Sequence, residues 1–320
     1  MQRRTLLAAL PAVAWPGVRA STYPEQPLRV VVPYAAGSAT DLLARAVAKR
    51  LGAALGQPAY VENRPGAGGT IGTAAAAKAP ADGYTLLMTG TPHVVNPWLY
   101  AQPGYDPLRD FVPLGTLSQS ASVLAVPAAS AARDVRGLME LGRAARDGLS
   151  YASGGNGTPA HLGGHALAKL GGFNGVHVPY KGASEIVNAL AGQTVEYGLP
   201  VMALAMTLIR SGRIRALAVT SAQRQPQLAD VPTLQESIPG GFVLSAWSML
   251  LAPAATPAGA VQRLSAALQA IVNHADYSQQ LAADGAQAFW QGDGPALTRF
   301  LQTESAQWKQ WVHDSGVRVG

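Results

Sequence analysis

Residues 28–55 read LRVVVPYAAGSATDLLARAVAKRLGAAL and predict a β-strand that runs into an α-helix. The apolar run 28–32 forms the strand, and apolar residues recur at helical spacing in the second half of the stretch. Ser38 or Thr40 can cap the helix, and Asp41 suits the positive end of its dipole. The loop between strand and helix consists of small residues that leave backbone N–H groups uncovered. A helix start of this kind attracts anions without a cationic side chain.

Residues 149–162, LSYASGGNGTPAHL, repeat this pattern. A strand leads into a loop of Gly, Ser and Asn, and a helix then begins with Thr158 as its cap and Pro159 at its first position. Here too, the loop contains no lysine or arginine. Two such loops that faced each other would hold a small molecule with a carboxylate group from both sides.

The whole chain is long enough for two lobes. It has 320 residues, of which 48% are hydrophobic and 13% charged, and domains usually contain about 100–200 residues. Strand and helix patterns alternate, which predicts an α/β fold with mostly parallel sheets. In such sheets ligands bind beyond the carboxyl ends of the strands. The polar loop 89–93, which follows the predicted strand 84–88, is therefore a third candidate for ligand contact, through Thr89 and Thr91.

The same periodicities predict the remaining elements. Further strands are predicted at 59–63, 111–117, 123–127, 175–180, 195–200, 216–219 and 247–251. Helices are predicted at 73–78, 138–146, 202–209, 257–270, 278–283 and 295–312, with another that ends at 191. The strand at 247–251 is the expected return of the chain to the first lobe.

The first twenty residues have the pattern of a signal peptide, which predicts export through the Sec or the twin-arginine route. Arg3 and Arg4 form a charged start, 6–15 an apolar core, and 18–20 a small-x-small cleavage site. Without this segment, 21 basic residues stand against 18 acidic ones, and no basic cluster indicates nucleic acid. The absence of cysteine excludes disulfides, thiolate metal sites and cysteine nucleophiles.

Motifs for catalysis, metals and cofactors are incomplete. The glycines of 66–72 miss the dinucleotide pattern G-x-G-x-x-G, so a tight strand-to-helix turn with close packing is favoured. His161 and His165 share a helix face and could bind zinc with His177, but no further ligand cluster accompanies them. Ser153 occupies a strand-to-helix turn without the G-x-S-x-G pattern of hydrolases. We therefore expect no metal, no cofactor and no enzyme activity; a hydrolase or isomerase is the enzyme alternative.

A series of segments, in order along nearly all of the chain after residue 20, matches one known family. These segments are PEQPLRVVVPYAAGSATDLLAR (24–45), ENRPGAGG (62–69), DGYTLL (82–87), YDPLRDF (105–111), YASGGNGTPAHL (151–162), HVPYKG (177–182), RALAVTS (215–221) and DVPT (230–233), followed by Trp247 and Pro253. With them the chain resembles the Bug receptors, the periplasmic substrate-binding proteins of tripartite tricarboxylate transporters.

The resemblance implies a two-lobed, type II-like periplasmic-binding-protein fold, with two mixed, mostly parallel α/β sheets and a ligand cleft between the lobes. Lobe 1 would comprise 21–123 and 248–320, and lobe 2 would comprise 124–247. The residues then expected to contact the ligand are Tyr34, Ala36, Gly37, Ser38, Thr40, Asp41, Thr89, Thr91, Ser153, Gly154, Gly155, Gly157, Thr158, His161 and Pro200.

Three positions depart from the family pattern. Ser38 stands where a second glycine is usual, and His165 stands where glutamate is often found. Pro200 occupies, within one residue, the position at which amino-acid-binding members can carry an acidic residue for the ammonium group. We therefore expect a carboxylate ligand without an amino group.

The function implied by the resemblance is that of a non-catalytic, monomeric receptor in the periplasm. It would close around a small carboxylate by hinge motion and deliver it to the membrane subunits of a transporter. A sensory role, in which the receptor presents its ligand to the ectodomain of a sensor kinase, is the alternative within the binding class. No nucleic-acid partner is expected.

Overall fold

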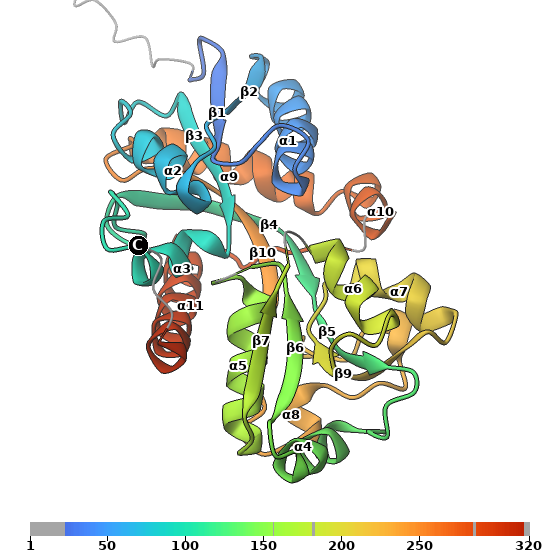
Figure 1. The fold of residues 1–320 in the computed structure, drawn as a ribbon. Helices are drawn as coiled ribbons and strands as arrows, with labels where there is room; N and C mark the ends of the chain where they lie inside the picture. The colour runs from blue at the N-terminus through green and yellow to red at the C-terminus, as the bar shows by residue number, and fades with distance from the viewer. Residues whose placement is uncertain (1–22, 156, 181–182, 284–285, 317–320) are drawn as a thin grey trace, which may run out of the picture.

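Two α/β sheets make up the protein in a computed structural model (Figure 1), which describes residues 23–155, 157–180, 183–283 and 286–316. The predicted signal peptide lies outside these residues. The first sheet has the strand order β11-β4-β10-β3-β1-β2 and the second β7-β6-β8-β5-β9. The strands are β1 Leu28–Val32, β2 Ala59–Asn63, β3 Thr85–Gly90, β4 Phe111–Ala121, β5 Val123–Pro127, β6 Leu149–Ser153, β7 Gly175–Pro179, β8 Tyr197–Gly198, β9 Ile214–Val219, β10 Ser245–Pro253 and β11 Gln287–Ala288.

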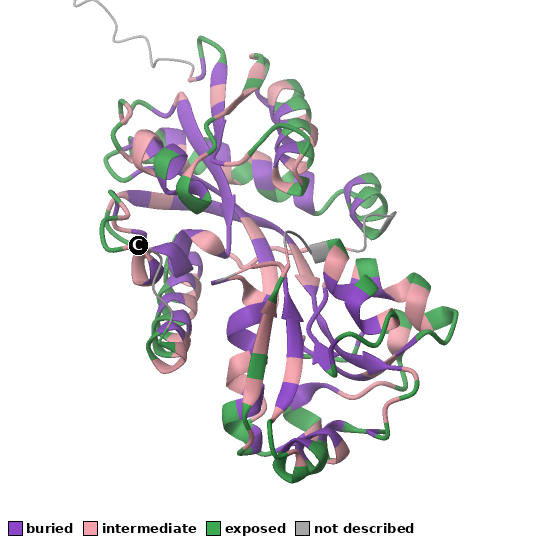
Figure 2. Ribbon diagram, in the orientation of Figure 1, coloured by how far each residue is buried: buried purple, intermediate pink, exposed green. Residues whose placement is uncertain are grey.

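Helices cover the sheets, and Figure 2 shows the strands largely buried and the outer faces of the helices exposed. None of the helices in the described part of the chain is long and apolar enough to cross a membrane. The helices are α1 Ala39–Leu55, α2 Thr70–Ala77, α3 Pro92–Leu99, α4 Val135–Ala144, α5 Pro159–Gly171, α6 Ala183–Ala191, α7 Met202–Arg210, α8 Leu234–Ser237, α9 Ala258–Val272, α10 Ala275–Ala283 and α11 Gly294–Ser315, with 3₁₀ turns at Ala67–Gly69 and Pro226–Leu228.

Both sheets are mixed, which confirms the predicted fold class. Strand β1 pairs in parallel with β2 and β3, whereas β10 is antiparallel to β3 and β4. In the second sheet β6 is parallel to β7 and β8, and β5 is antiparallel to β8 and β9. Figure 1 shows β1 and β3 running toward the second sheet and β6 and β7 running toward the first. The loops at their carboxyl ends therefore face each other.

One buried threonine ties together the two places where the chain passes between the sheets. Ser122 lies between β4 and β5, and Leu244 directly precedes β10. The backbone N–H of Ser122 donates to Thr220 Oγ1 at 2.9 Å. The Thr220 hydroxyl lies 2.9 Å from the Ser122 carbonyl oxygen and 2.5 Å from that of Leu244. Thr220 is fully buried, so these contacts hold both crossing segments in one position.

The C-terminal helix packs against elements of both sheets. Helix α11 contacts α3 and β4 of the first sheet and α5 of the second. Asp314 on α11 forms an ion pair of 2.8 Å with Lys169 on α5. The indole N–H of Trp247 on β10 donates to Glu304 on α11 at 2.7 Å. One hydrophobic core consequently runs through both sheets, and a second lies between the first sheet, α1 and α9.

Several element predictions need correction. The loop predicted at 89–93 is wrong: β3 continues to Gly90, and α3 begins at Pro92. Pro92 suits the first helical position, and the residues that follow it bury one face of a helix. Strand β4 runs four residues farther than predicted, to Ala121, because it pairs with β10 over this whole length. The strand predicted at 195–200 shortens to the two residues of β8, and α8 was not predicted.

Candidate ligand-binding site

The first predicted loop joins β1 to α1, and the cap of that helix shapes it. Ser38 is the N-cap residue, since its Oγ accepts a hydrogen bond from Asp41 N at 3.3 Å. Gly37 has a φ of 82°, a left-handed conformation that favours glycine. Ala36 is exposed and Thr40 is partly buried. The loop thus presents backbone groups and small side chains.

The carboxylate of Asp41 holds this loop together. It is 1% exposed, and its Oδ2 accepts from Gly37 N at 2.8 Å and from Arg45 Nε at 3.0 Å. Asn63 donates to Asp41 Oδ1 at 2.9 Å and to the Tyr34 carbonyl oxygen at 3.1 Å. These bonds, that from Arg45 above all, lower the pKa of Asp41 to about 2. Asp41 therefore shapes the loop, together with Asn63, which the sequence analysis missed although it ends the strand next to β1.

Tyr34, Thr89 and Thr91 come from the ends of β1 and β3, which are neighbours in the sheet. Gly69 packs closely against the Tyr34 ring: a Cβ added at Gly69 would lie 3.1 Å from Tyr34 Cε1. Burial raises the pKa of the Tyr34 phenol to about 12, and the nearby Thr89 side chain partly offsets this rise. Thr91 Oγ1 accepts the backbone N–H of Trp247 at 3.3 Å.

The hydroxyl of Thr89 differs from that of Thr91 because it is buried and, beyond its interaction with the Tyr34 phenol, has no hydrogen-bond partner among the described residues. A buried polar group left unpaired costs about 1–3 kcal/mol. A polar ligand atom or a water molecule that reached Thr89 would recover this cost. Among the predicted residues of the first sheet, Thr89 therefore has a buried hydroxyl whose neighbour is the Tyr34 phenol and which could bind one further polar atom.

The second predicted loop joins β6 to α5. Ser153 is fully buried, and its Oγ lies 2.6 Å from His177 Nε2 and 3.0 Å from Gly155 N. Thr158 occupies the N-cap position of α5, as predicted, but its hydroxyl donates to the Gly155 carbonyl oxygen at 2.7 Å and makes no side-chain cap. Gly154 is partly buried beside them. The loop is therefore closed by its own hydroxyl groups and by His177, which the sequence analysis considered only as a metal ligand.

His161 reaches this loop from the first turn of α5. Its Nδ1 accepts the backbone N–H of Gly157 at 3.0 Å, and its ring is stacked on that of His177 with centroids 3.7 Å apart. Burial lowers the pKa of His161 to about 4, with smaller contributions from His177 and His165. Among the described residues, no group of three or more His, Asp or Glu side chains could hold a metal ion. Stacked rings also direct their nitrogens along parallel planes rather than toward one point.

The second loop also contacts a helix of the first sheet. Gly157, with a φ of 75°, lies so close to Leu99 at the end of α3 that an added Cβ would be 2.4 Å from Leu99 Cδ1. Pro200 lies elsewhere, in the buried segment between β8 and α7. Its carbonyl oxygen accepts the N–H of Val123 at 3.0 Å. The structure thus brings the second loop to α3 and places Pro200 beside a crossing segment.

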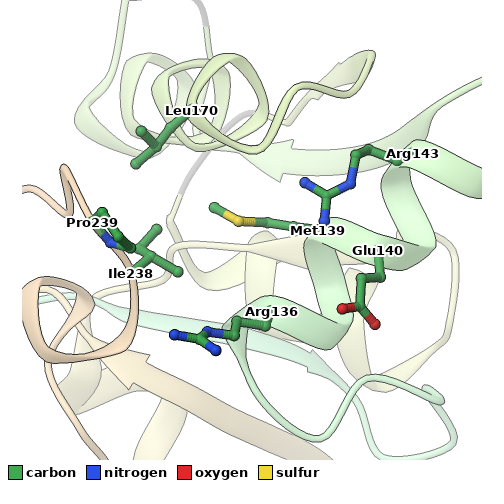
Figure 3. A pocket seen from close by; sticks show the side chains of 7 residues that line it. All are labelled: Arg136, Met139, Glu140, Arg143, Leu170, Ile238 and Pro239. Carbon is green, nitrogen blue, oxygen red and sulfur yellow. The ribbon is translucent and has the colours of Figure 1, made fainter.

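Two surface pockets lie apart from these loops. Figure 3 shows one of about 280 Å³ at α4 and the end of α5, lined by Arg136, Met139, Glu140, Arg143, Leu170, Ile238 and Pro239. The other, of about 510 Å³, is lined by residues of α9 and by Val112, Thr256, Asp293 and Gly294. Neither pocket contains a predicted ligand-binding residue. The candidate site therefore rests on the hydrogen-bonding groups of the loops.

These loops contain hydroxyl and backbone N–H groups and no cationic side chain. Several of the N–H groups are bonded within the loops, that of Gly37 to Asp41, that of Gly155 to Ser153 and that of Gly157 to His161. The guanidinium of Arg45, beside the first loop, is bonded to Asp41 and to Asn63. Backbone donors at helix starts suit a small anion whose charge is shared among several hydrogen bonds. The Ser153–His177 pair resembles the first half of a hydrolytic triad, but in the described structure no carboxylate is bonded to His177.

Comparison with solved structures identifies the class of protein. "R. palustris Rpa4515 with adipate" has a TM-score of 0.77 and is 30% identical, with coverage of 92% of this chain and 99% of that chain. "Structure of periplasmic binding protein BugD" has a TM-score of 0.74, 34% identity and coverage of 92% and 99%. MatC from Rhodopseudomonas palustris, with bound malate, has a TM-score of 0.74, 29% identity and coverage of 91% and 100%. The fold is that of the periplasmic solute-binding proteins.

The family follows from the sequence comparisons. The model of the TctC family, described as "Tripartite tricarboxylate transporter family receptor", matches residues 43–317. A UPF0065 protein in the tcbD-tcbE intergenic region of Pseudomonas sp. (strain P51) is 35% identical over 97% of this chain and 94% of its own length. The chain belongs to the tripartite tricarboxylate transporter receptor family. Its homologues are solute-binding receptors and not enzymes, which rules against a hydrolase or isomerase.

Proposed function

We propose that this protein is a periplasmic receptor that binds a small carboxylate and delivers it to a tripartite tricarboxylate-type membrane transporter. The observation that carries the proposal is the pair of loops, 34–41 and the described residues 153–155 and 157–158, that face each other from the two sheets and contain hydroxyl and backbone N–H groups but no lysine or arginine. Relatives of the same fold hold adipate and malate. A periplasmic location agrees with the family and with the signal-peptide pattern of residues 1–20.

The ligand carboxylate would lie between these loops, near the buried Thr89 hydroxyl, which has no partner besides the Tyr34 phenol among the described residues. Each hydrogen bond from a donor to a charged carboxylate contributes about 1.5–3 kcal/mol. Three or four of them are enough for micromolar affinity, which corresponds to about 8 kcal/mol. Affinity on this scale needs no lysine or arginine in the site.

The same residues disfavour an amino-acid ligand. A carboxylate with free lone pairs is the strongest protein partner of an ammonium group, and Asp41 is the one acidic residue in the predicted set. Both of its oxygens already accept hydrogen bonds from Gly37, Arg45 and Asn63. Pro200 supplies no charge. The ligand is therefore a carboxylate without an amino group.

Binding would proceed by closure of two lobes, 21–123 with 248–320 and 124–247. The sheet memberships support this division to within a few residues, since β5 to β9 all lie between Ser122 and Leu244. The contacts of Thr220 with both of these residues support a hinge at the two crossing segments. A ligand that touches both loops binds the closed form better and shifts the population toward it.

A thermal-shift screen of mono-, di- and tricarboxylates and of amino acids, with adipate and malate included, tests the ligand class. A ligand at 100 times its dissociation constant adds about 2.7 kcal/mol to the unfolding free energy. Tight binding of aspartate or glutamate would refute the carboxylate assignment. Ser38→Gly is the matched variant, because glycine at an N-cap costs only a few tenths of a kcal/mol. We expect it to alter ligand preference and to leave the fold intact.

Delivery is tested by uptake of the identified carboxylate into proteoliposomes that contain the membrane subunits. Uptake that depends on the added receptor supports transport. Liganded receptor that binds a sensor-kinase ectodomain and does not stimulate uptake would favour the sensory role instead.

A further inference from the structure

The contact between His161 and Gly157 links the chemistry of a side chain to the position of a loop. Gly157 N donates to His161 Nδ1 at 3.0 Å, and the His161 side chain is only 5% exposed. A ring nitrogen that accepts a hydrogen bond carries no proton. The ring is therefore neutral, and its proton resides on Nε2.

The groups around His161 favour this neutral state. The ring of His177 in β7 is stacked on that of His161, with centroids 3.7 Å apart, and the centroid of the Tyr151 ring in β6 lies 6.3 Å from that of His161. His165 is one turn farther along α5. Tyr197 of β8 is stacked on Tyr151 behind them. No carboxylate of the described residues contributes to the lowered pKa of His161, about 4, which results mainly from burial.

The glycine held by this bond is also the point of contact with the other sheet. Gly157 has a left-handed backbone and leaves no room for a Cβ, because Leu99 of α3 occupies that space. A displacement of the Gly157 backbone would therefore disturb the packing of the second loop against α3. Thr158, which follows Gly157 and donates its hydroxyl hydrogen bond to the Gly155 carbonyl oxygen at 2.7 Å, would move with it.

We propose that His161 is a positioning residue: its unprotonated Nδ1 anchors Gly157 and thereby sets the second loop against Leu99 in the ligand-competent arrangement. Protonation of Nδ1 would place two N–H groups opposite each other and release the loop. His177 does not act in the same way, since its Nε2 faces a Ser153 hydroxyl that can either donate or accept. The role of His161 in ligand binding rests on the proposed function, whereas its anchoring of Gly157 does not.

Nitrogen-15 NMR of the ligand-free protein tests the anchor directly. We expect His161 to be the Nε2–H tautomer, and the Gly157 amide resonance to titrate with a midpoint near the pKa of His161, about 4. In His161→Asn, whose side-chain oxygen takes the place of Nδ1, this resonance should stay in its bonded position and no longer titrate. His165→Asn, on the same helix, should still show the titration, with a midpoint slightly above that of the wild type because His165 contributes to the lowered pKa of His161. The proposal would be overturned if the neutral His161 ring carried its proton on Nδ1. It would also be overturned if the Gly157 amide resonance did not change when His161 ionises.

Binding measurements test the consequence for the ligand, with the carboxylate identified in the screen as the probe. His161→Gln places its amide one bond too far from Gly157, so it should bind at least tenfold more weakly at pH 7 than His161→Asn. From pH 7 to pH 4, the wild type should weaken about twofold relative to His161→Asn, because half of its molecules lose the anchor at the midpoint. Because both proteins bind the same ligand, the ratio of their affinities at each pH does not depend on the ionisation of the ligand. Equal affinities of the Gln and Asn variants would refute the positioning role. If no carboxylate binds, the proposed function fails while the NMR experiment still decides the anchor.

Discussion

Replacing Asp41 with asparagine is expected to destabilise the protein at neutral pH and much less in acid. The pKa of Asp41 falls from 3.8 to about 2 in the folded chain, and each pKa unit corresponds to about 1.4 kcal/mol. The full difference is about 2.4 kcal/mol. Solvent screens part of this interaction, since the Arg45 side chain is 52% exposed. We therefore expect a loss of about 1–2 kcal/mol at pH 7.

The pH dependence distinguishes this charge effect from a change of shape. Because the folded pKa of Asp41 is lowered, its stabilisation is fully present above the unfolded pKa and is lost as the pH falls toward 2. The deficit of Asp41→Asn in urea unfolding should therefore shrink to about half by pH 3. Asp106→Asn is the matched control, because it removes one carboxylate from an exposed turn. A deficit of Asp41→Asn that stays constant from pH 7 to pH 3 would refute the reasoning.

Three further substitutions test other parts of the structure. Burial raises the pKa of Glu304, so the folded protein disfavours the ionised carboxylate and loses stability as the pH rises through that pKa. Glu304→Gln should therefore increase the unfolding free energy at pH 7 but not at pH 4. A lower unfolding free energy of this variant at pH 7 would contradict the reasoning. Gly157→Ala should weaken binding of the identified carboxylate at least tenfold in calorimetry. Adding Leu99→Ala to this variant should restore part of the lost affinity. A double variant that binds no better than Gly157→Ala would argue against the contact between Gly157 and Leu99. Thr220→Val leaves the Ser122 N–H without its side-chain acceptor and should cost about 1–3 kcal/mol in urea unfolding, whereas Thr220→Ser should cost less.

The strands and helices were predictable wherever a short window contains the whole signal. Helix α1 was found because Ser38 and Asp41 mark its start and apolar residues follow at regular spacing. The glycines of 66–72 were correctly interpreted as a close-packed turn, since Gly72 leaves no room for a Cβ beside the Arg64 carbonyl oxygen. Helix α3 was missed because a short helix of mixed apolar and polar residues after a strand has the same local pattern as a loop.

The pairing of strands was less predictable than their existence. Alternation of strands and helices indicates parallel neighbours, but β10 lies antiparallel between β3 and β4 and returns from the other sheet. Its place depends on where the intervening residues fold, and no periodicity within β10 reports that. The residue contacts of the candidate site have the same origin. Asn63 bonds to Asp41 across two strand ends, and His177 stacks on His161 across a strand and a helix.

The sequence by itself determined the α/β class, the family and the two small-residue loops that precede α1 and α5, because these depend on residue type and on spacing within a few turns of chain. Only the tertiary structure decided that the Asp41 carboxylate accepts hydrogen bonds from Gly37, Arg45 and Asn63. It also decided that His161 accepts from Gly157 and that Leu99 fills the space beside that glycine. Hydrogen bonds and van der Waals contacts act over a few ångströms. Their partners are therefore chosen by which distant segments folding brings together.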